Sequence, residues 1–246
     1  MLLQNKIAVI TGNPYGIGRV SAELLTQEGA RVVCIDDSKI GWQFGKDDSH
    51  AHPELLGDVS DPHAVSSIVA QCEKKLERID ILVNLAGRAL KMRFEETDKN
   101  TWDNMIARNL TAAFLCSQRF LPLIKKSPAG VIINHASIDG FLGNPSLAAY
   151  SAGKGGVLPL THVMAHDLGK YCIRVNSIST GGIRDGEERP ADASRVRVTP
   201  LRRTGTPLDV ARVVLFLATE LSSYVNGANI VVDGGRTAIT QGCYED

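Results

Sequence analysis

Short apolar stretches rich in β-branched residues recur along the chain and alternate with longer amphipathic stretches. A short apolar run predicts a buried strand, whereas an apolar stripe with a period near 3.6 residues predicts a helix. The expected strands are 6–11, 31–36, 79–84, 130–137, 173–179 and 229–234, with a weaker one at 54–58. The expected helices are 17–29, 61–77, 101–126, 147–170 and 207–219.

This alternation indicates the fold class. Strands that are apolar along their whole length, with helices between them, are typical of a parallel sheet that is covered on both faces. A chain of 246 residues is long enough for one sizeable domain of this kind. We therefore expect a single α/β domain, residues 1–246, built on a doubly wound parallel sheet of about seven strands.

Two polar segments interrupt the alternation. Residues 37–53 are aperiodic where a helix is expected, and residues 185–206 are charged and contain two prolines. The second segment is predicted to be a mobile surface loop, and a loop of this length in a compact domain is usually functional.

The amino-acid composition limits the classes of binding partner that we expect. The 27 basic residues equal the 27 acidic residues in number, which argues against nucleic acid or an anionic membrane as the main partner. No apolar run reaches transmembrane length, and the first residues lack the features of a signal peptide. The five cysteines show no metal-ligand spacing, so we expect buried free thiols, no metal site and a cytoplasmic location.

The segment "TGNPYGIG" (11–18) follows the first expected strand and opens the first helix. Gly12, Gly16 and Gly18 allow a tight turn and a close approach of the backbone to a pyrophosphate at the helix N-terminus. A glycine-rich turn alone is weak evidence, but its setting between a strand and a helix predicts a dinucleotide site.

Asp36 ends the second expected strand, twenty residues after Gly16. A carboxylate at this point accepts hydrogen bonds from the two ribose hydroxyls of an adenosine, and it repels a 2′-phosphate. Asp37 adds to that repulsion. The sequence therefore predicts NAD rather than NADP.

"AAYSAGKGG" (148–156) places Tyr150 and Lys154 four residues apart, on one face of a helix. Taken alone, this pair also fits an ordinary solvated helix face. The chain carries further motifs in a fixed order: "GDVSD" (57–61), "NLAG" (84–87), "ARNLTAAFLCSQ" (107–118), "IINHAS" (132–137) and the C-terminal segment 200–235. With these motifs, the chain resembles the short-chain dehydrogenase/reductase family over nearly its whole length, which implies a Rossmann-type sheet.

The resemblance implies four catalytic residues. Tyr150 is the acid/base, and Ser137 donates a hydrogen bond to the substrate oxygen. Lys154 binds the nicotinamide ribose and favours the phenolate, and Asn109 holds a water that links Lys154 to solvent. A free phenol has a pKa near 10, so we expect Lys154 and the oxidised nicotinamide to lower the pKa of Tyr150 by about three units.

The cofactor-binding residues that follow from the turn, from Asp36 and from the resemblance form one set. They are Gly12, Tyr15, Gly16, Ile17, Gly18, Asp36, Asp37, Asp58, Val59, Asn84, Ala86, Gly87, Tyr150, Lys154, Gly181 and Ile183.

Several residues depart from the family pattern. Leu85 replaces an asparagine, and Pro159 lies inside the catalytic helix, where it predicts a kink. Thr180 replaces the proline that usually precedes Gly181. Asp185 occupies the position of a threonine that usually meets the nicotinamide carboxamide, so its role is not carried over.

The resulting prediction is an NAD-dependent oxidoreductase that interconverts a secondary alcohol and a ketone, assembled as a homotetramer or homodimer through helices 101–126 and 147–170. Two alternatives are a 3-oxoacyl carrier-protein reductase, which usually uses NADPH, and a catalytically silent NAD-binding protein. The substrate is a small molecule that the sequence does not name. The pocket is expected to be lined by Arg88, Leu90, Asp139, Phe141, Leu142, Asn144, Leu147 and residues 182–197.

The segment 185–206 has two interpretations. It is a lid that orders over cofactor and substrate, with Arg189, Arg195 and Arg197 facing an anionic group, or it is a solvated charged surface.

Overall fold

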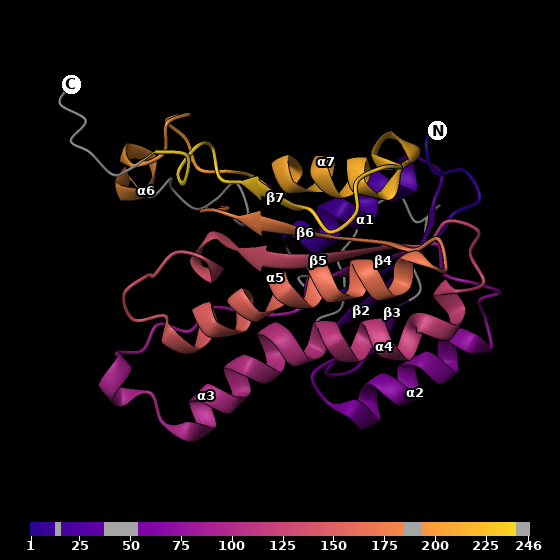
Figure 1. Cartoon of the computed structure of the whole chain (residues 1–246), viewed down its shortest axis with the longest axis horizontal. Helices are drawn as coiled ribbons and strands as arrows, with labels where there is room; N and C mark the ends of the chain where they lie inside the picture. Colours follow the sequence, from indigo (N-terminus) through magenta and orange to yellow (C-terminus); the bar gives the residue numbers. More distant parts are fainter. Residues whose placement is uncertain (13–15, 37–53, 185–192, 240–246) are drawn as a thin grey trace.

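Seven parallel strands form one sheet in the order β3-β2-β1-β4-β5-β6-β7 (Figure 1). The computed structural model describes residues 1–12, 16–36, 54–184 and 193–239. The strands are β1 (Ile7–Thr11), β2 (Arg31–Asp36), β3 (Glu54–Leu56), β4 (Ile81–Asn84), β5 (Val131–Ser137), β6 (Arg174–Thr180) and β7 (Asn229–Val232). The strand order reverses between β1 and β4, and ligands of open α/β sheets bind at the carboxyl ends of the strands beside such a reversal.

Helices cover both faces of the sheet, with α1 and α7 over one face and α2, α4 and α5 over the other (Figure 1). The helices are α1 (Ile17–Gln27), α2 (Pro62–Glu73), α3 (Lys99–Ile106), α4 (Ala112–Ile124), α5 (Ala148–Gly169), α6 (Ala193–Arg197) and α7 (Pro207–Ala218). Alternate strand residues enter opposite cores: Ile10 and Val83 pack on the α1 and α7 side, and Val9 and Leu82 pack on the other side. The predicted doubly wound α/β class is confirmed.

The predicted helix 101–126 is not one regular helix. It begins with α3, passes through a π-helical turn, η3 (Ala107–Thr111), and continues as α4. At this turn the N–H of Ala112 donates to the carbonyl of Ala107, five residues earlier. The side chain of Asn109 donates to the carbonyl of Met105 at 3.0 Å, and such a side-chain bond competes with the backbone N–H for that carbonyl. Periodicity does not reveal a one-residue insertion of this kind.

The helix α5 runs from Ala148 to Gly169 with Pro159 inside it, on the exposed side, and the expected kink at Pro159 stays a prediction. The expectation of loop structure throughout 185–206 is wrong for α6, and Ile183 forms a parallel bridge with Gly205. Residues 185–192 and 37–53 lie outside the described residues. The described residues also include the 3₁₀ turns η2 (Phe94–Glu96), η4 (Ile138–Gly140) and η5 (Glu220–Ser222).

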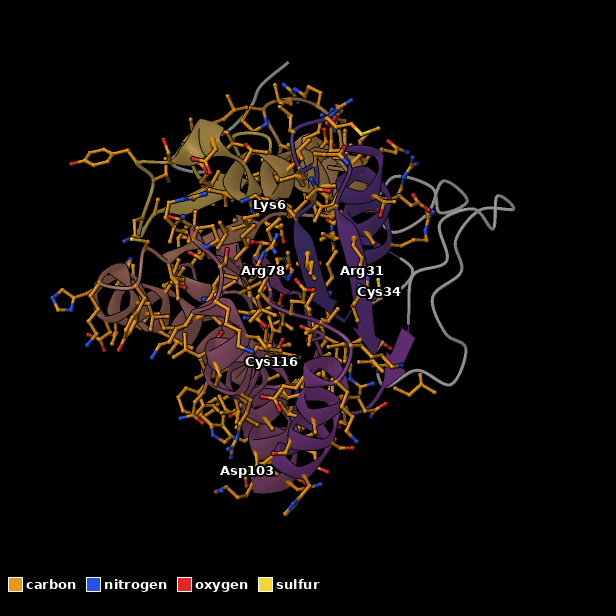
Figure 2. The ribbon with its side chains drawn as sticks, turned by 90° about the vertical axis from the view of Figure 1, so that its right-hand side faces the viewer. Lys6, Arg31, Cys34, Arg78, Asp103 and Cys116 are labelled. Carbon is orange, nitrogen blue, oxygen red and sulfur yellow. The ribbon has the colours of Figure 1, made fainter. Side chains whose placement is uncertain are left out.

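The cysteines of the described part are free thiols. Cys34, Cys72 and Cys116 are buried and Cys172 is exposed; Figure 2 labels Cys34 on β2 and Cys116 on α4. Burial raises the pKa of Cys72 to about 11 and that of Cys116 to about 12, so both thiols stay protonated and unreactive near neutral pH. Across the described ranges, no helix has the length and apolarity needed to cross a membrane.

Candidate active site

The four predicted catalytic residues converge at the carboxyl edge of β4, β5 and β6. Ser137 ends β5, Tyr150 and Lys154 lie on the first turns of α5, and Asn109 lies in the π-helical turn. Ser137, Lys154 and Asn109 are 4%, 2% and 2% exposed. Residues that are up to 45 positions apart in the chain are therefore gathered in one buried site.

Glycines allow α5 to approach this edge closely. A Cβ atom on Gly153 would lie 3.0 Å from Cβ of Asn109, and one on Gly155 would lie 2.8 Å from the carbonyl oxygen of Gly140. The small residues beside Tyr150 and Lys154 thus allow the backbone of α5 to pack closely on its neighbours. This packing determines how far both side chains extend into the site.

Lys154 extends into the protein and donates a hydrogen bond from Nζ to the carbonyl oxygen of His135 at 2.8 Å. Burial lowers the pKa of Lys154 to about 7. The backbone of Gly87 passes beside this ammonium, since a Cβ atom there would lie 3.3 Å from Nζ. A φ of +132° at Gly87 favours glycine, which explains this residue in the "NLAG" turn.

The two polar atoms of the Asn109 side chain differ in their hydrogen bonding. Its Nδ2 donates to the carbonyls of Met105 and Arg88 at 3.0 and 3.1 Å. Its Oδ1 is buried without a hydrogen-bond partner among the described residues, and it faces Gly87 next to Lys154. A buried acceptor of this kind is normally satisfied by water, so the geometry fits the predicted water beside Lys154.

The hydroxyl of Ser137 lies near enough to Tyr150 to lower the pKa of its phenol, an arrangement that fits a pair acting on one substrate oxygen. The protein groups around Tyr150 set the direction of its pKa, and the expected lowering, which includes the charge of the oxidised nicotinamide, stays a prediction. Burial raises the pKa of Tyr150 and the charge of Asp139 adds to this effect, while the hydrogen bond with Ser137 opposes it. Lys154 is not among the groups that shift the pKa of Tyr150, and its ammonium donates to the carbonyl of His135.

His135 and Thr180 form a contact that the sequence analysis missed. Nε2 of His135 lies 3.0 Å from Oγ1 of Thr180, so the strand that carries Ser137 is tied to the turn before Gly181. Burial and the charge of Lys154 hold the pKa of His135 well below its usual range, which keeps the imidazole neutral. The available signal was an ionisable residue inside an otherwise apolar strand, two positions before Ser137.

The glycines of the predicted dinucleotide site lie where a side chain would not fit or would cover the helix N-terminus. Gly12 has a φ of +77°, and a Cβ atom there would lie 2.5 Å from Cα of Ala86, so the β1 and β4 turns touch. Gly16 precedes α1, and a glycine has no side chain to cover the helix N-terminus. Asp36 ends β2 and is 8% exposed. These features fit a pyrophosphate and an adenosine ribose; Tyr15 and Asp37 lie outside the described residues.

Other predicted cofactor residues have clear structural roles. Asp58 accepts from the backbone and side chain of Ser60 at 2.9 and 2.6 Å. Burial opposes ionisation of Asp58, but these bonds and Arg108 outweigh it and lower its pKa. Val59 is buried beside it. Asn84 donates to Ser117 and Asn134 rather than to the cofactor edge, so its side chain joins β4, α4 and β5.

The residues at the nicotinamide end also have defined positions. Gly181 packs against Asp233, since a Cβ atom added to Gly181 would lie 2.8 Å from Cβ of Asp233. Ile183 forms a parallel bridge with Gly205. The predicted contacts Ile17 and Gly18 are buried in the first turn of α1.

A cavity of about 560 Å³ opens beside Ser137. Its lining comprises residues 137–139, 142–145, 180–182, 194–195, 197–199 and 236, and we refer to it as the Ser137 cavity. Asp139, Leu142 and Asn144 line it as predicted, whereas Arg88, Leu90, Phe141 and Leu147 do not. Arg236 lines it and was not anticipated.

The fold and these residues define a Rossmann-type oxidoreductase. The family model described as enoyl-(acyl carrier protein) reductase matches residues 11–237. The chain is 37% identical to a 3-oxoacyl-acyl-carrier-protein reductase of Thermotoga maritima, with 96% of this chain and 99% of the relative covered. It is 35% identical to a meso-2,3-butanediol dehydrogenase of Serratia marcescens, with 97% of each covered.

Among solved structures, a provisionally named gluconate dehydrogenase of Agrobacterium tumefaciens superposes with a TM-score of 0.90 at 29% identity, covering 97% of this chain and 98% of the other. The chain belongs to the short-chain dehydrogenase/reductase family, whose members use a nicotinamide cofactor.

Proposed function

We propose that this protein is an NAD-dependent oxidoreductase that interconverts a secondary alcohol and a ketone. The observation that carries the proposal is the convergence of Ser137, Tyr150, Lys154 and Asn109 in one buried site that adjoins a cavity of about 560 Å³. A pure binding protein has no use for a buried acid/base next to such a cavity. The names of relatives that act on secondary alcohols, such as meso-2,3-butanediol, support the same reaction class.

Ser137 and Tyr150 would act on the substrate oxygen together. Ser137 lies near enough to Tyr150 to lower the pKa of its phenol, so that one substrate oxygen could accept a hydrogen bond from both hydroxyl groups. The bound nicotinamide supplies or accepts the hydride at the substrate carbon. In the direction of ketone reduction, Tyr150 gives its proton to the oxygen, and a raised pKa keeps that proton on the phenol beforehand.

Lys154 and Asn109 would supply Tyr150 with a new proton after it has given its own to the substrate oxygen. The ammonium and the unpartnered Oδ1 of Asn109 both face Gly87, so a water held at Oδ1 would lie beside Lys154. Because the pKa of Lys154 is about 7, this amine can both take up and release a proton near neutral pH. The cofactor would be held by the Gly12–Gly18 turn, by Asp36 and by Gly87.

NAD is proposed over NADP because of Asp36. A largely buried carboxylate at the end of β2 suits ribose hydroxyls as ligands, and it repels a phosphate. The same residue disfavours the alternative activity as a 3-oxoacyl carrier-protein reductase, which the name of the T. maritima relative supports.

The test is NADH absorbance with a panel of secondary alcohols and ketones, run beside acetoacetyl thioesters with NADPH. Turnover of simple alcohols with NAD supports the proposal. Faster turnover of the thioesters with NADPH would favour the alternative. Binding of NADH without turnover of any compound would indicate a silent binding protein.

A further inference from the structure

Three arginines from two separate segments line the Ser137 cavity. Arg195 and Arg197 belong to α6, and Arg236 follows β7 by four residues. Among the described residues of that lining, Asp139 is the single carboxylate, and its Oδ1 accepts a hydrogen bond from Asn144 at 3.0 Å. Within the described lining, positive side chains therefore exceed negative ones by two.

Arg195 is held against the turn that follows Thr180. A Cβ atom on Gly182 would lie 3.1 Å from Cδ and 3.4 Å from a terminal nitrogen of Arg195. Thr199 donates to the carbonyl of Arg195 at 2.7 Å, which fastens the end of α6 to the next turn. The absence of a side chain at Gly182 thus lets the side chain of Arg195 lie against the backbone of this turn, where both residues line the cavity.

Arg236 reaches the same cavity because the segment after β7 packs on residues 199–201. The N–H of Leu201 donates to Gly234 at 3.2 Å, and a Cβ atom on Gly234 would lie 2.7 Å from Cγ2 of Thr199. The carboxylate of Asp233 accepts from the backbone N–H groups of Gly235 and Thr237 at 2.8 and 2.7 Å. This carboxylate shapes the turn that carries Arg236.

Arg197 is the arginine of this cavity whose interactions are the simplest to describe. It has no hydrogen bond or ion pair within the ranges that the structure describes. Because the chain as a whole carries no net charge, the excess at this cavity is a local feature. A planar guanidinium matches the two oxygens of a carboxylate or phosphate, and several arginines around one cavity select an anionic group.

We propose that the substrate is an anionic secondary alcohol or ketone, whose carboxylate or phosphate group is held by Arg197 with Arg195 and Arg236. This inference rests on the proposed function, because it places the reacting oxygen at Ser137 and Tyr150. The shared chemistry is an oxyanion attached near the reacting carbon, and the cavity of about 560 Å³ is within the usual range for a small-molecule site.

The kinetic test uses matched pairs of secondary alcohols with NAD. One pair is 3-hydroxybutanoate and 3-hydroxybutanamide, and the other is 2-hydroxypropyl phosphate and 1,2-propanediol. The anionic member of at least one pair should react with a kcat/KM at least about tenfold higher than its neutral partner. The pair that responds distinguishes a carboxylate from a phosphate substrate.

The variants Arg197→Ala and Arg236→Ala should raise the KM of the anionic member by about tenfold and leave the neutral member within about twofold. Arg197→Lys should restore part of the affinity. Arg212→Ala is the matched control, because Arg212 is an exposed arginine on α7 that does not line the cavity.

A binding arm separates this inference from the proposed function. The melting temperature of the NADH-loaded protein is measured with malonate or inorganic phosphate, against sodium chloride of equal ionic strength. A rise that Arg197→Ala abolishes supports the anion site even where no alcohol is oxidised, and an absence of all turnover would count against the function alone. Equal kinetics for both members of each pair, or no specific rise, would overturn the anion site.

Discussion

The ammonium of Lys154 lies 2.8 Å from the carbonyl oxygen of His135, in a site where the lysine side chain is almost fully buried. Among the described residues, that carbonyl is the hydrogen-bond partner of this amine. The lysine is therefore placed for function at a cost to the stability of the protein.

Lys154→Met should remove that cost. The pKa of Lys154 is about 7 when folded and 10.5 when exposed, so the unfolded chain binds the extra proton between these values. The free energy of unfolding of the unmodified protein should thus rise between pH 7 and pH 10.5. The variant lacks the ionisable amine, so its free energy of unfolding should lack this rise. At pH 7 the cofactor-free variant should melt higher by at least about 4 °C, and the difference should shrink toward pH 10. A variant that melts lower at pH 7 would contradict this account of Lys154.

Gly87→Ala should damage both folding and activity. The added Cβ would lie 2.5 Å from Oδ1 of Asn109 and 3.3 Å from Nζ of Lys154, at a φ of +132°. We expect a loss of about 2 kcal/mol or more in the free energy of unfolding, measured by urea denaturation. Gly143→Ala is the control, because a Cβ there has no atom within 4 Å. Equal stability of the two variants would show that Gly87 is not constrained.

Cofactor selectivity should depend on Asp36. We expect kcat/KM to favour NAD over NADP by at least about tenfold, which corresponds to about 1.4 kcal/mol. Asp36→Ala should reduce this ratio, while Glu73→Ala, an equal change of charge on the exposed side of α2, should leave it unchanged. Equal use of NAD and NADP by the unmodified protein would contradict the role of Asp36.

The protein should assemble through α4 and α5. Phe114 on α4 and Val163 on α5 are 43% and 58% exposed, which is unusual for large apolar side chains on two helices of one face. Light scattering should give two or four times the subunit mass of 26.5 kDa. Val163→Glu should weaken the assembly, and Leu221→Glu, at an exposed site on η5, should not. A monomer at micromolar concentration would exclude this interface.

The sequence predicted the sheet well because both of its faces are covered. The strands β1, β2 and β4 are then largely apolar, and the glycine turn and Asp36 mark the ends of β1 and β2. The convergence of Ser137, Tyr150 and Lys154 was also predicted, since the spacing of motifs within a family fixes their place on the fold.

The parts that escaped prediction depend on contacts between distant segments. The π-helical turn at Asn109 arises from a side-chain hydrogen bond to Met105, which periodicity does not encode. Arg236 reaches the Ser137 cavity because Gly234 packs on Thr199, and His135 meets Thr180 across two strands. The rise that burial causes in the pKa of Tyr150 was not anticipated, because the sequence alone does not measure burial.

The central claim is that Tyr150 transfers the proton in an NAD-dependent reaction. Its most direct test is the NADH absorbance of Tyr150→Phe beside the unmodified protein, with NADH affinity measured by fluorescence. The account predicts turnover below a few per cent of the unmodified rate, with NADH affinity within about twofold, because the substitution removes one ionisable hydroxyl and little packing. Turnover by Tyr150→Phe close to the unmodified rate would contradict the account.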